Sequence, residues 1–255
     1  MTSGKKLYFA SDFHLGVPSY ESSLEREKRI ITWLEMARSD AEEIYLMGDV
    51  FDFWFEYKHV IPKGFVRFLG KLAELTDQGI NIVLFKGNHD MWMFDYLEKE
   101  IGVTVISDEL IIERFGKRFY LHHGDGLGPG DAKYKFLKKI FRSKTCQWLF
   151  SWLHPSIGIA IAKYWSKSSR IASNQKETFV SEEKEWLVQF SKSLLTSEHF
   201  DYFIFGHRHL PLSIQLDHAS QYVNLGEWIN YNSYAVFDGS TLQLLYWETE
   251  RQRSV

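Results

Sequence analysis

The strongest constraint on the fold is a repeated pattern in which a short apolar run leads directly into glycine and polar side chains. Five such runs occur in this chain of 255 residues, at 6–10, 43–47, 81–85, 118–122 and 201–205. Near-continuous apolar runs rich in aromatic and β-branched residues are typical of strands that are buried on both faces. Between the first three runs, apolar residues recur at helical spacing over 24–34 and 65–75. This alternation predicts an α/β fold.

The C-terminal part of the chain has a different pattern, in which short runs are separated by turn residues. These runs lie at 221–225, 233–237 and 242–247, and Asp238-Gly239 between the last two is a turn signal. We expect an antiparallel meander that closes the sheet.

Each of the five predicted strands ends in a block of side chains that bind metals well. The blocks are Asp12-Phe13-His14, Gly48-Asp49, Gly87-Asn88-His89-Asp90, His122-His123-Gly124-Asp125 and Gly206-His207-Arg208-His209, and they hold six of the ten histidines. Since the loops beyond the carboxyl ends of strands converge on one crevice, we expect one shared site. Mixed oxygen and imidazole ligands suit Mn²⁺, Fe²⁺ or Zn²⁺ better than Ca²⁺.

In this order the blocks D-x-H, G-D, G-N-H-D, H-G-D and G-H-x-H resemble the signature of the calcineurin-like metallophosphoesterases, over about residues 7–211. The resemblance implies an αββα sandwich, with two mixed sheets flanked by helices, and a pair of divalent metal ions. By this likeness the ligands of one ion would be Asp12, His14 and His209, those of the other Asn88, His123 and His207, and Asp49 would bridge both. His122 is the alternative to His123, which we prefer because it directly precedes Gly124-Asp125.

A pair of divalent ions lowers the pKa of a bridging water and so supplies a hydroxide for attack on phosphorus. The resemblance gives Asp49 and Asn88 catalytic roles with the metals. It gives His89 a role in stabilising the transferring phosphate or protonating the leaving oxygen. The alternative for His89 is to orient a carboxylate such as Asp49. The single cysteine, Cys146, lies in an apolar segment and is expected to be inert. The other acidic residues near the blocks are expected to orient ligands or cap segments: Asp52, Asp90 and Asp125.

The segment 132–176 differs from the rest of the chain in charge. It holds ten Lys or Arg and no Asp or Glu, which leaves 20 basic and 33 acidic residues for the remainder. Its first part is a basic amphipathic helix, and 145–162 has no formal charge but is interrupted by His154-Pro155. Because a helix normally ends before proline, we expect two short helices there and no membrane span. The predicted organisation is a catalytic core of 1–131 and 177–255 with 132–176 as an inserted helical cap.

Three further stretches resemble a narrower family, the UDP-2,3-diacylglucosamine hydrolases of lipid A biosynthesis in Gram-negative bacteria. They are Gly48 to Trp54, His123 to Tyr134 and Arg170 to Glu177. The resemblance implies Mn²⁺-dependent attack on the α-phosphorus of UDP-2,3-diacylglucosamine, which gives UMP and 2,3-diacylglucosamine 1-phosphate (lipid X). The substrate contacts that it implies are Asn88, His89, Asp131, Tyr134, Arg170, Asn174 and Lys176. One departure is that His89 stands where that family typically has arginine.

The apolar part of the cap suits acyl chains. The residues expected to line a cleft are Leu149, Phe150, Trp152, Leu153, Ile157, Ile159 and Ile161. Lys163, Lys167 and Arg170 would meet phosphate or anionic headgroups. With no signal peptide in the polar stretch 1–6, we expect a cytoplasmic enzyme held peripherally on the inner membrane, without nucleic acid or an obligate protein partner.

Three alternatives stay open. The first is that the cap helices simply pack on the core, with solvated lysines. The second is a soluble phosphodiester or nucleotide as the substrate, and the third is a scaffold that has lost catalysis.

Overall fold

The computed structural model describes residues 5–127, 132–172 and 178–247, with the backbone alone at 132–133 and 167–172. Its strands are β1 (Lys6–Ala10), β2 (Ala41–Leu46), β3 (Asn81–Phe85), β4 (Thr104–Ile106), β5 (Leu110–Arg114), β6 (Lys117–His122), β7 (Tyr202–Phe205), β8 (Pro211–Gln215), β9 (Gln221–Leu225), β10 (Ser233–Phe237) and β11 (Leu242–Tyr246). Its helices are α1 (Tyr20–Ala37), α2 (Val66–Asp77), α3 (Ala132–Arg142), α4 (Lys144–Ser151), α5 (Pro155–Ala172) and α6 (Trp186–Leu195), with a π-helical turn at Leu97–Ile101 and a 3₁₀ turn at Glu182–Lys184.

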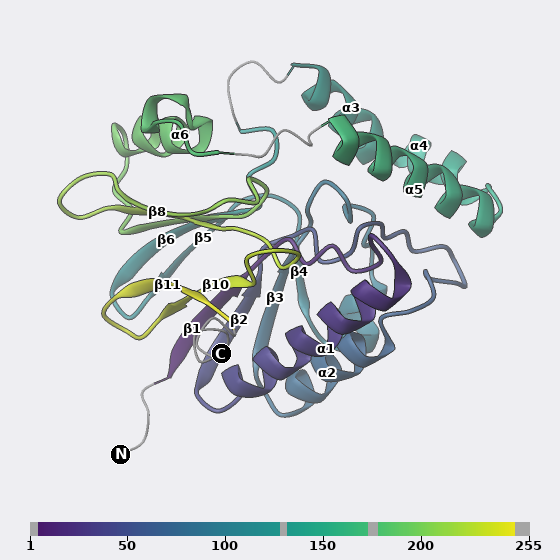
Figure 1. Cartoon of the computed structure of the whole chain (residues 1–255), viewed down its shortest axis with the longest axis horizontal. Coiled ribbons are helices and arrows are strands. Elements are labelled where there is room, and N and C mark those ends of the chain that lie inside the picture. Colours follow the sequence, from purple (N-terminus) through teal and green to yellow (C-terminus); the bar gives the residue numbers. More distant parts are fainter. Residues whose placement is uncertain (1–4, 128–131, 173–177, 248–255) are drawn as a thin grey trace, which may run out of the picture.

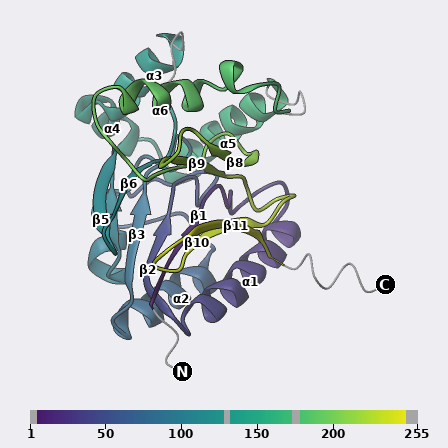
Figure 2. The same ribbon diagram turned by 90° about the vertical axis from the view of Figure 1, so that its left-hand side faces the viewer.

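The strands form two mixed sheets, as the sequence predicts. The first has the order β11-β10-β1-β2-β3-β4 and the second β5-β6-β7-β9-β8. In the first sheet β1 to β4 are parallel and β10 runs antiparallel to β1. Figures 1 and 2 show α1 and α2 over the outer face of the first sheet and α6 over the second. The αββα layering is therefore confirmed.

Three apolar clusters correspond to the three interfaces of this sandwich. One joins α1 and α2 to the first sheet and includes Trp33 and Phe68. The second lies between the sheets, where the ring of Phe9 stacks on that of Tyr45 with centroids 5.0 Å apart. The third joins the second sheet to α6. The five strands that carry the polar blocks are thus fixed from both faces.

The predicted C-terminal meander is wrong in one respect. β10 and β11 do pair antiparallel at the edge of the first sheet, but β9 belongs to the second sheet and runs parallel to β7. The hairpin partner of β9 is β8, a strand that the sequence analysis missed. β8 begins at Pro211 and is an edge strand with no fully buried residue, so it lacks the continuous apolar run of the central strands. β4, β5 and α6 were missed as well.

The helix α2 obtains its N-terminal cap from another helix. Phe65 precedes α2 in a left-handed conformation and provides no side-chain cap. Instead the buried Glu27 of α1 accepts hydrogen bonds from the backbone N–H groups of Arg67 and Phe68, both at 3.0 Å. A carboxylate in this position also complements the positive end of the helix dipole. Glu27 therefore fixes the relative position of α1 and α2.

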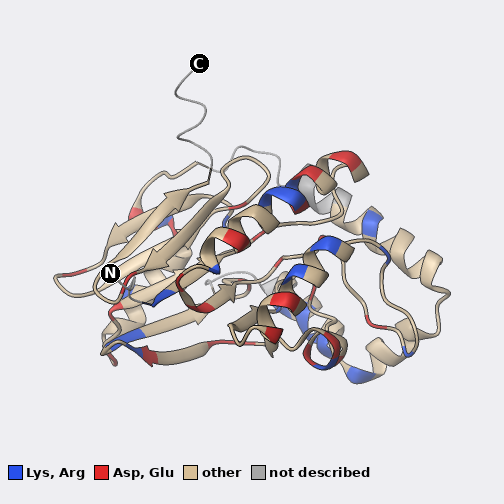
Figure 3. Cartoon of the chain, turned by 90° about the horizontal axis from the view of Figure 1, so that it is seen from below, with Lys and Arg blue, Asp and Glu red and all other residues tan. Residues whose placement is uncertain are grey.

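The inserted helices α3, α4 and α5 follow β6 in the chain and lie together above one end of the molecule (Figure 1). The predicted interruption is confirmed, because α4 ends at Ser151 and α5 begins at Pro155. Among the described residues, none of the helices combines the length and apolar character that a membrane crossing requires. In Figure 3, red and blue bands intermix on α1 and α2, whereas α3 to α5 contain no acidic residue.

Candidate metal centre

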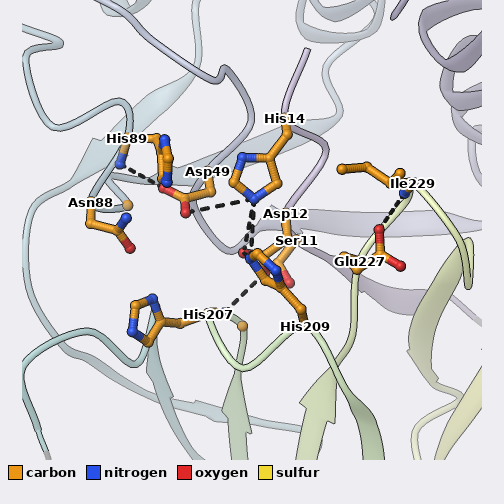
Figure 4. Close-up of polar contacts among 12 residues, drawn as sticks. Ser11, Asp12, His14, Asp49, Asn88, His89, His207, His209, Glu227 and Ile229 are labelled. Carbon is orange, nitrogen blue, oxygen red and sulfur yellow. Dashed lines mark hydrogen bonds and ion pairs between the residues drawn. The ribbon is translucent and has the colours of Figure 1, made fainter. Parts of the chain in front are cut away.

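All five polar blocks meet at one place in the structure. The loops after β1, β2 and β3 bring their blocks from the first sheet, and those after β6 and β7 from the second. Figure 4 shows the side chains of Asp12, His14, Asp49 and His209 pointing toward one another. The convergence follows from the parallel arrangement of these strands, whose carboxyl ends lie on one side.

The first group of potential ligands is formed by Asp12, His14, Asp49 and His209, whose ligand atoms lie within 4.8 Å of one another. His14 Nε2 is 3.1 Å from His209 Nε2. It is 3.7 Å from Asp12 Oδ1 and 3.9 Å from Asp49 Oδ2. Two imidazoles and two carboxylates at these separations can surround one cation.

The second group shares Asp49 with the first. It consists of Asp49, His123 and His207, again within 4.8 Å. His123 Nε2 is 3.5 Å from Asp49 Oδ2 and 3.2 Å from Asn88 Oδ1, so Asn88 lies at this group too. The structure therefore brings together all seven residues that the sequence analysis proposed as ligands, and Asp49 lies between the two groups.

The atoms that face away from the centre are held by the backbone. The N–H of His89 donates to Asp49 Oδ1 at 2.8 Å, which leaves Oδ2 toward both groups. The N–H of His207 donates to Asp12 Oδ2 at 3.0 Å. His123 Nδ1 lies 2.8 Å from the carbonyl oxygen of Met47. Donation from Nδ1 to that oxygen presents Nε2 to the centre. Such outer contacts orient ligands in metal sites.

The backbone is strained at the same residues. Asp12, His14, Asp49, His207 and His209 all have positive φ, between 44° and 65°. Left-handed conformations are uncommon outside glycine, and they cluster where a site requires them. The neighbouring glycines complete the approach of the loops, since a Cβ on Gly206 would lie 2.6 Å from Asp12 Oδ2.

The charges of the centre match a bound cation. Burial alone would raise the pKa of Asp49, but the histidines around it hold that pKa well below its usual range. Burial would lower the pKa of His123, yet the carboxylates that it faces, chiefly Asp49, raise it to about 10. Asp12 Oδ1 and His14 Nδ1 are buried without a hydrogen-bond partner. Buried polar atoms of this kind are normally satisfied, and a metal ion at Asp12 would satisfy its oxygen. The donor set therefore fits divalent metal.

His89 lies beside the two groups rather than in them. Its ring centroid is 4.9 Å from that of His14, and it forms a third cluster with His14 and Asp52. His89 Nδ1 is 3.1 Å from the carbonyl oxygen of Asp52. The alternative interpretation, in which the His89 ring orients a carboxylate, stays open. Only the backbone N–H of His89 reaches Asp49, but the ring Nδ1 lies 3.8 Å from Asp52 Oδ1.

Two further acidic residues support the loops. Asp90 accepts hydrogen bonds from the N–H groups of Gly87 at 2.8 Å and Phe51 at 3.1 Å, and burial together with Asp49 raises its pKa to about 7. Asp125 accepts from the Tyr134 hydroxyl at 2.6 Å and lies 2.6 Å from Lys138 Nζ. The contacts of Asp90 fit the capping role expected for it, whereas those of Asp125 are with residues of α3 and not with ligand candidates.

His122 is not part of either group. Its Nδ1 accepts the Gly124 N–H at 2.8 Å, and burial lowers its pKa to about 4.

A cavity of about 260 Å³ opens beside the centre, between the core and the inserted helices. Asn88 and His89 lie at its polar part. Its apolar lining comes from the core and from α3 to α5: Phe53, Met91, Trp92, Leu137, Phe141, Phe150, Ile161 and Trp165. A site with a few polar groups in an aromatic wall is typical of small-molecule recognition.

The substrate contacts implied by the resemblance are only partly described. Tyr134 lines the cavity while its hydroxyl is engaged by Asp125. Asp131, Asn174 and Lys176 lie outside the described residues, and Arg170 is described only as part of the backbone of α5.

The expected lining of the cleft was partly wrong. Phe150 and Ile161 line the 260 Å³ cavity, and Ile159 lines a larger one of about 510 Å³ next to it. The other four side chains are instead exposed: Leu149, Trp152, Leu153 and Ile157.

Other residues of the site had escaped the sequence analysis. Phe141 and Trp165 both line the cavity, and their rings stack with centroids 6.0 Å apart. Nothing in the sequence distinguishes a phenylalanine or tryptophan that lines a cavity from one that packs elsewhere on a helix. The buried Arg26 donates to the carbonyl oxygens of His14 and Val17 and so holds the loop after β1. An arginine on an amphipathic helix normally suggests a solvated face.

Comparison with known proteins identifies the family of the chain. The family model described as calcineurin-like phosphoesterase matches residues 5–211. The chain is 41% identical to UDP-2,3-diacylglucosamine hydrolase of Porphyromonas gingivalis, over 94% of this chain and 96% of that protein. It is 29% identical to the protein of that name from Haemophilus influenzae, over 92% and 96%. Among solved structures, Vps29 of Chaetomium thermophilum aligns over 96% of this chain and 87% of its own, with a TM-score of 0.45 at 10% identity. The chain belongs to the calcineurin-like phosphoesterase family.

Proposed function

We propose that this protein hydrolyses the diphosphate bond of UDP-2,3-diacylglucosamine and releases UMP and 2,3-diacylglucosamine 1-phosphate. The observation that carries the proposal is the continuity of the metal centre with the 260 Å³ cavity, whose wall is aromatic and aliphatic. A substrate with a diphosphate and acyl chains needs both environments side by side. The relatives named UDP-2,3-diacylglucosamine hydrolase support the same substrate.

The centre would hold two divalent ions. Mixed oxygen and imidazole donors suit Mn²⁺, Fe²⁺ or Zn²⁺, and the likeness to the UDP-2,3-diacylglucosamine hydrolases favours Mn²⁺ among them. Asp12, His14 and His209 would bind one ion, Asn88, His123 and His207 the other, and Asp49 both. Bound there, the ions would lower the pKa of a water and neutralise charge on the phosphate.

The side chains beyond the ligands have separate roles in this proposal. Asn88 and His89 line the cavity and so face the substrate. His89 would stabilise the transferring phosphate or protonate the leaving oxygen, since its Nδ1 is engaged by Asp52 and its Nε2 is the nitrogen left for the substrate.

The segment 132–176 would act as a cap that covers the acyl chains. Phe141 of α3, Phe150 of α4 and Trp165 of α5 all line the cavity, and Phe150 also packs on Trp92 of the core at 4.8 Å. Each of the three inserted helices thus contributes to the apolar wall.

The first experiment compares UDP-2,3-diacylglucosamine with UDP-glucosamine in the presence of Mn²⁺. We expect a much larger kcat/KM for the diacyl substrate. Phe141→Ala should raise KM for it, because it removes part of the wall, whereas Tyr164→Ala on the exposed side of α5 should not. Equal turnover of both substrates would refute the lipid specificity and favour a soluble phosphoester.

We also propose that the cap meets the membrane from which the substrate comes. Trp148, Leu149, Trp152 and Ile157 are each more than half exposed, and the rings of Trp148 and Trp152 lie 5.8 Å apart. Exposed tryptophans beside basic residues, in a segment without acidic ones, are typical of an interfacial surface.

Sedimentation with vesicles containing anionic phospholipid tests this contact. The native protein should pellet with such vesicles, and the double variant W148S/W152S should pellet much less. Val66→Ser removes an equally exposed apolar side chain from α2 and should bind as the native chain does. If the double variant binds the vesicles as well as the native protein does, the proposal that the cap contacts the membrane is refuted.

A further inference from the structure

The cap reaches His89 through the buried hydroxyl of Ser166. Ser166 of α5 is 7% exposed, and its Oγ lies 2.9 Å from Asp52 Oδ1 and 2.8 Å from Asp52 Oδ2. The same Oγ is 3.4 Å from His89 Nδ1. Asp52 follows β2 in the core, so this contact joins residues that are 114 positions apart in the chain.

The hydrogen-bond inventory of these groups fixes the direction of the contact. An ionised carboxylate can only accept, so the single Ser166 proton goes to Asp52. The lone pairs of Oγ then face His89 Nδ1, which also lies 3.1 Å from the carbonyl oxygen of Asp52. With acceptors on both sides, Nδ1 would carry the ring proton of a neutral His89, and Nε2 would remain for the substrate.

We infer that Ser166 is a positioning residue, which couples the seating of the cap helix α5 to the orientation of His89. The inference rests on the role proposed for His89 in hydrolysis. It adds a group from the cap, because α3 contacts the core through other residues, Tyr134 and Lys138 at Asp125. With α5 packed on the core as in this structure, Ser166 Oγ lies beside Asp52 and His89. A displacement of α5 from the core would remove the Ser166 hydroxyl from both residues.

The coupling gives the cap a second task beside covering the acyl chains. A cap residue that orients His89 only in the closed position would tie turnover to a properly bound substrate. The lining of the cavity fits this coupling, because Ser166, Asp52 and His89 line the same cavity as the apolar wall proposed for the acyl chains.

The test is a double-mutant cycle on kcat at saturating Mn²⁺ and substrate. Ser166→Ala should lower kcat roughly 10-fold or more, as loss of an orienting partner typically does, with KM changed little. Ser166→Thr, which keeps the hydroxyl, should retain most of the activity. Ser156→Ala, an exposed serine on the same helix, should match the native chain. In a His89→Ala background, Ser166→Ala should have no further effect.

Two kinetic results would overturn the inference. One is a loss of kcat in the His89→Ala background as large as in the native one, because Ser166 would then act independently of His89. The other is an increase in KM with kcat unchanged, which would make Ser166 a packing residue of the cap.

A spectroscopic readout keeps the inference separate from the proposed substrate. In protein loaded with diamagnetic Zn²⁺ and carrying ¹⁵N-labelled histidine, Ser166→Ala should shift the His89 ring-nitrogen resonances and Ser156→Ala should not. Unshifted His89 resonances would refute the contact. A native chain that leaves UDP-2,3-diacylglucosamine intact would refute the proposed function, while the His89 shift would still decide the role of Ser166.

Discussion

Replacing Gly87 by alanine should disable the metal centre while the chain remains folded. Gly87 lies in the loop after β3, against the residue that the two ligand groups share. A Cβ built at Gly87 would lie 2.1 Å from Asp49 Oδ1 and 2.4 Å from the Asp49 backbone nitrogen. Ordinary contacts begin near 3.4 Å, so the Asp49 backbone nitrogen must lie about 1.0 Å farther from the added Cβ. The effect is steric, since Gly87 does not require a positive φ.

The magnitude follows from the position of Asp49. Its carboxylate can rotate, but its backbone nitrogen cannot, so the whole residue must move. Asp49 Oδ2 lies 3.9 Å from His14 Nε2 and 3.5 Å from His123 Nε2, and a shift of this size changes both separations. A misplacement of about 1 Å can cost roughly 100-fold in rate, so we expect kcat/KM to fall by at least that factor. Overpacking should also lower the free energy of unfolding by about 1–3 kcal/mol.

The assay is Mn²⁺-dependent hydrolysis, with metal content and urea unfolding measured on the same samples. Gly70→Ala is the matched control, because Gly70 lies in α2 with nothing within 4 Å of the added methyl group. It should leave kcat/KM unchanged and stabilise the protein by about 0.5–1 kcal/mol. A Gly87→Ala protein with kcat/KM within about threefold of native would refute the steric argument.

Two other predictions concern metal binding and the helical layer. The pKa of His123 in the metal-free chain is about 10, so its ring is protonated at pH 7.5, and metal binding should release about one proton there and fewer as the pH approaches 10. Calorimetry in buffers of different ionisation enthalpy measures this release, and a binding heat independent of the buffer would contradict it. Glu27→Ala should lower the free energy of unfolding by about 1–2 kcal/mol, because the N–H groups of Arg67 and Phe68 lose their acceptor. Urea unfolding tests this. The control is Glu25→Ala, which should cause little change because Glu25 lies on the exposed side of the same helix.

The central strands were predictable because burial on both faces produces a local signal. β1, β3, β9 and β10 have the bounds that their apolar runs indicate. β5 alternates between intermediate and exposed residues, and β4 has three residues, so neither forms such a run. Which sheet a strand joins depends on contacts between distant segments, and β9 was therefore placed in the wrong sheet.

The ligand candidates were predictable for a related reason. Each polar block is short and follows its own strand. The parallel order within the first sheet brings Asp12 and Asp49 together, and the packing of the second sheet on the first adds His123. The contact between Ser166 and Asp52 was not predictable, because it depends on where a helix more than a hundred positions away is seated. Local patterns predict which polar residues lie at the ends of the strands. They contain no information on how an inserted segment packs over the site that these residues form.

The charge asymmetry of the chain has a structural explanation that its sequence does not reveal. The basic segment 132–176 suggests an external anion, yet two of its cations face acidic residues of the core. Lys138 Nζ lies 2.6 Å from Asp125, and Arg142 lies 2.7 Å from Asp108. The Lys138 pair is largely buried, where screening by salt is weak. Part of the basic charge therefore forms ion pairs with acidic residues of the core, so it does not serve to bind substrate or membrane.

This attachment bears on catalysis because of where it occurs. Asp125 follows His123 by two positions, and Asp52, the partner of Ser166, follows Asp49 by three. The cap thus contacts the core through α3 next to one ligand candidate and through α5 next to the one that both groups share. A displacement of the cap would break its contacts with Asp125 and Asp52, which lie in the same loops as these ligand candidates.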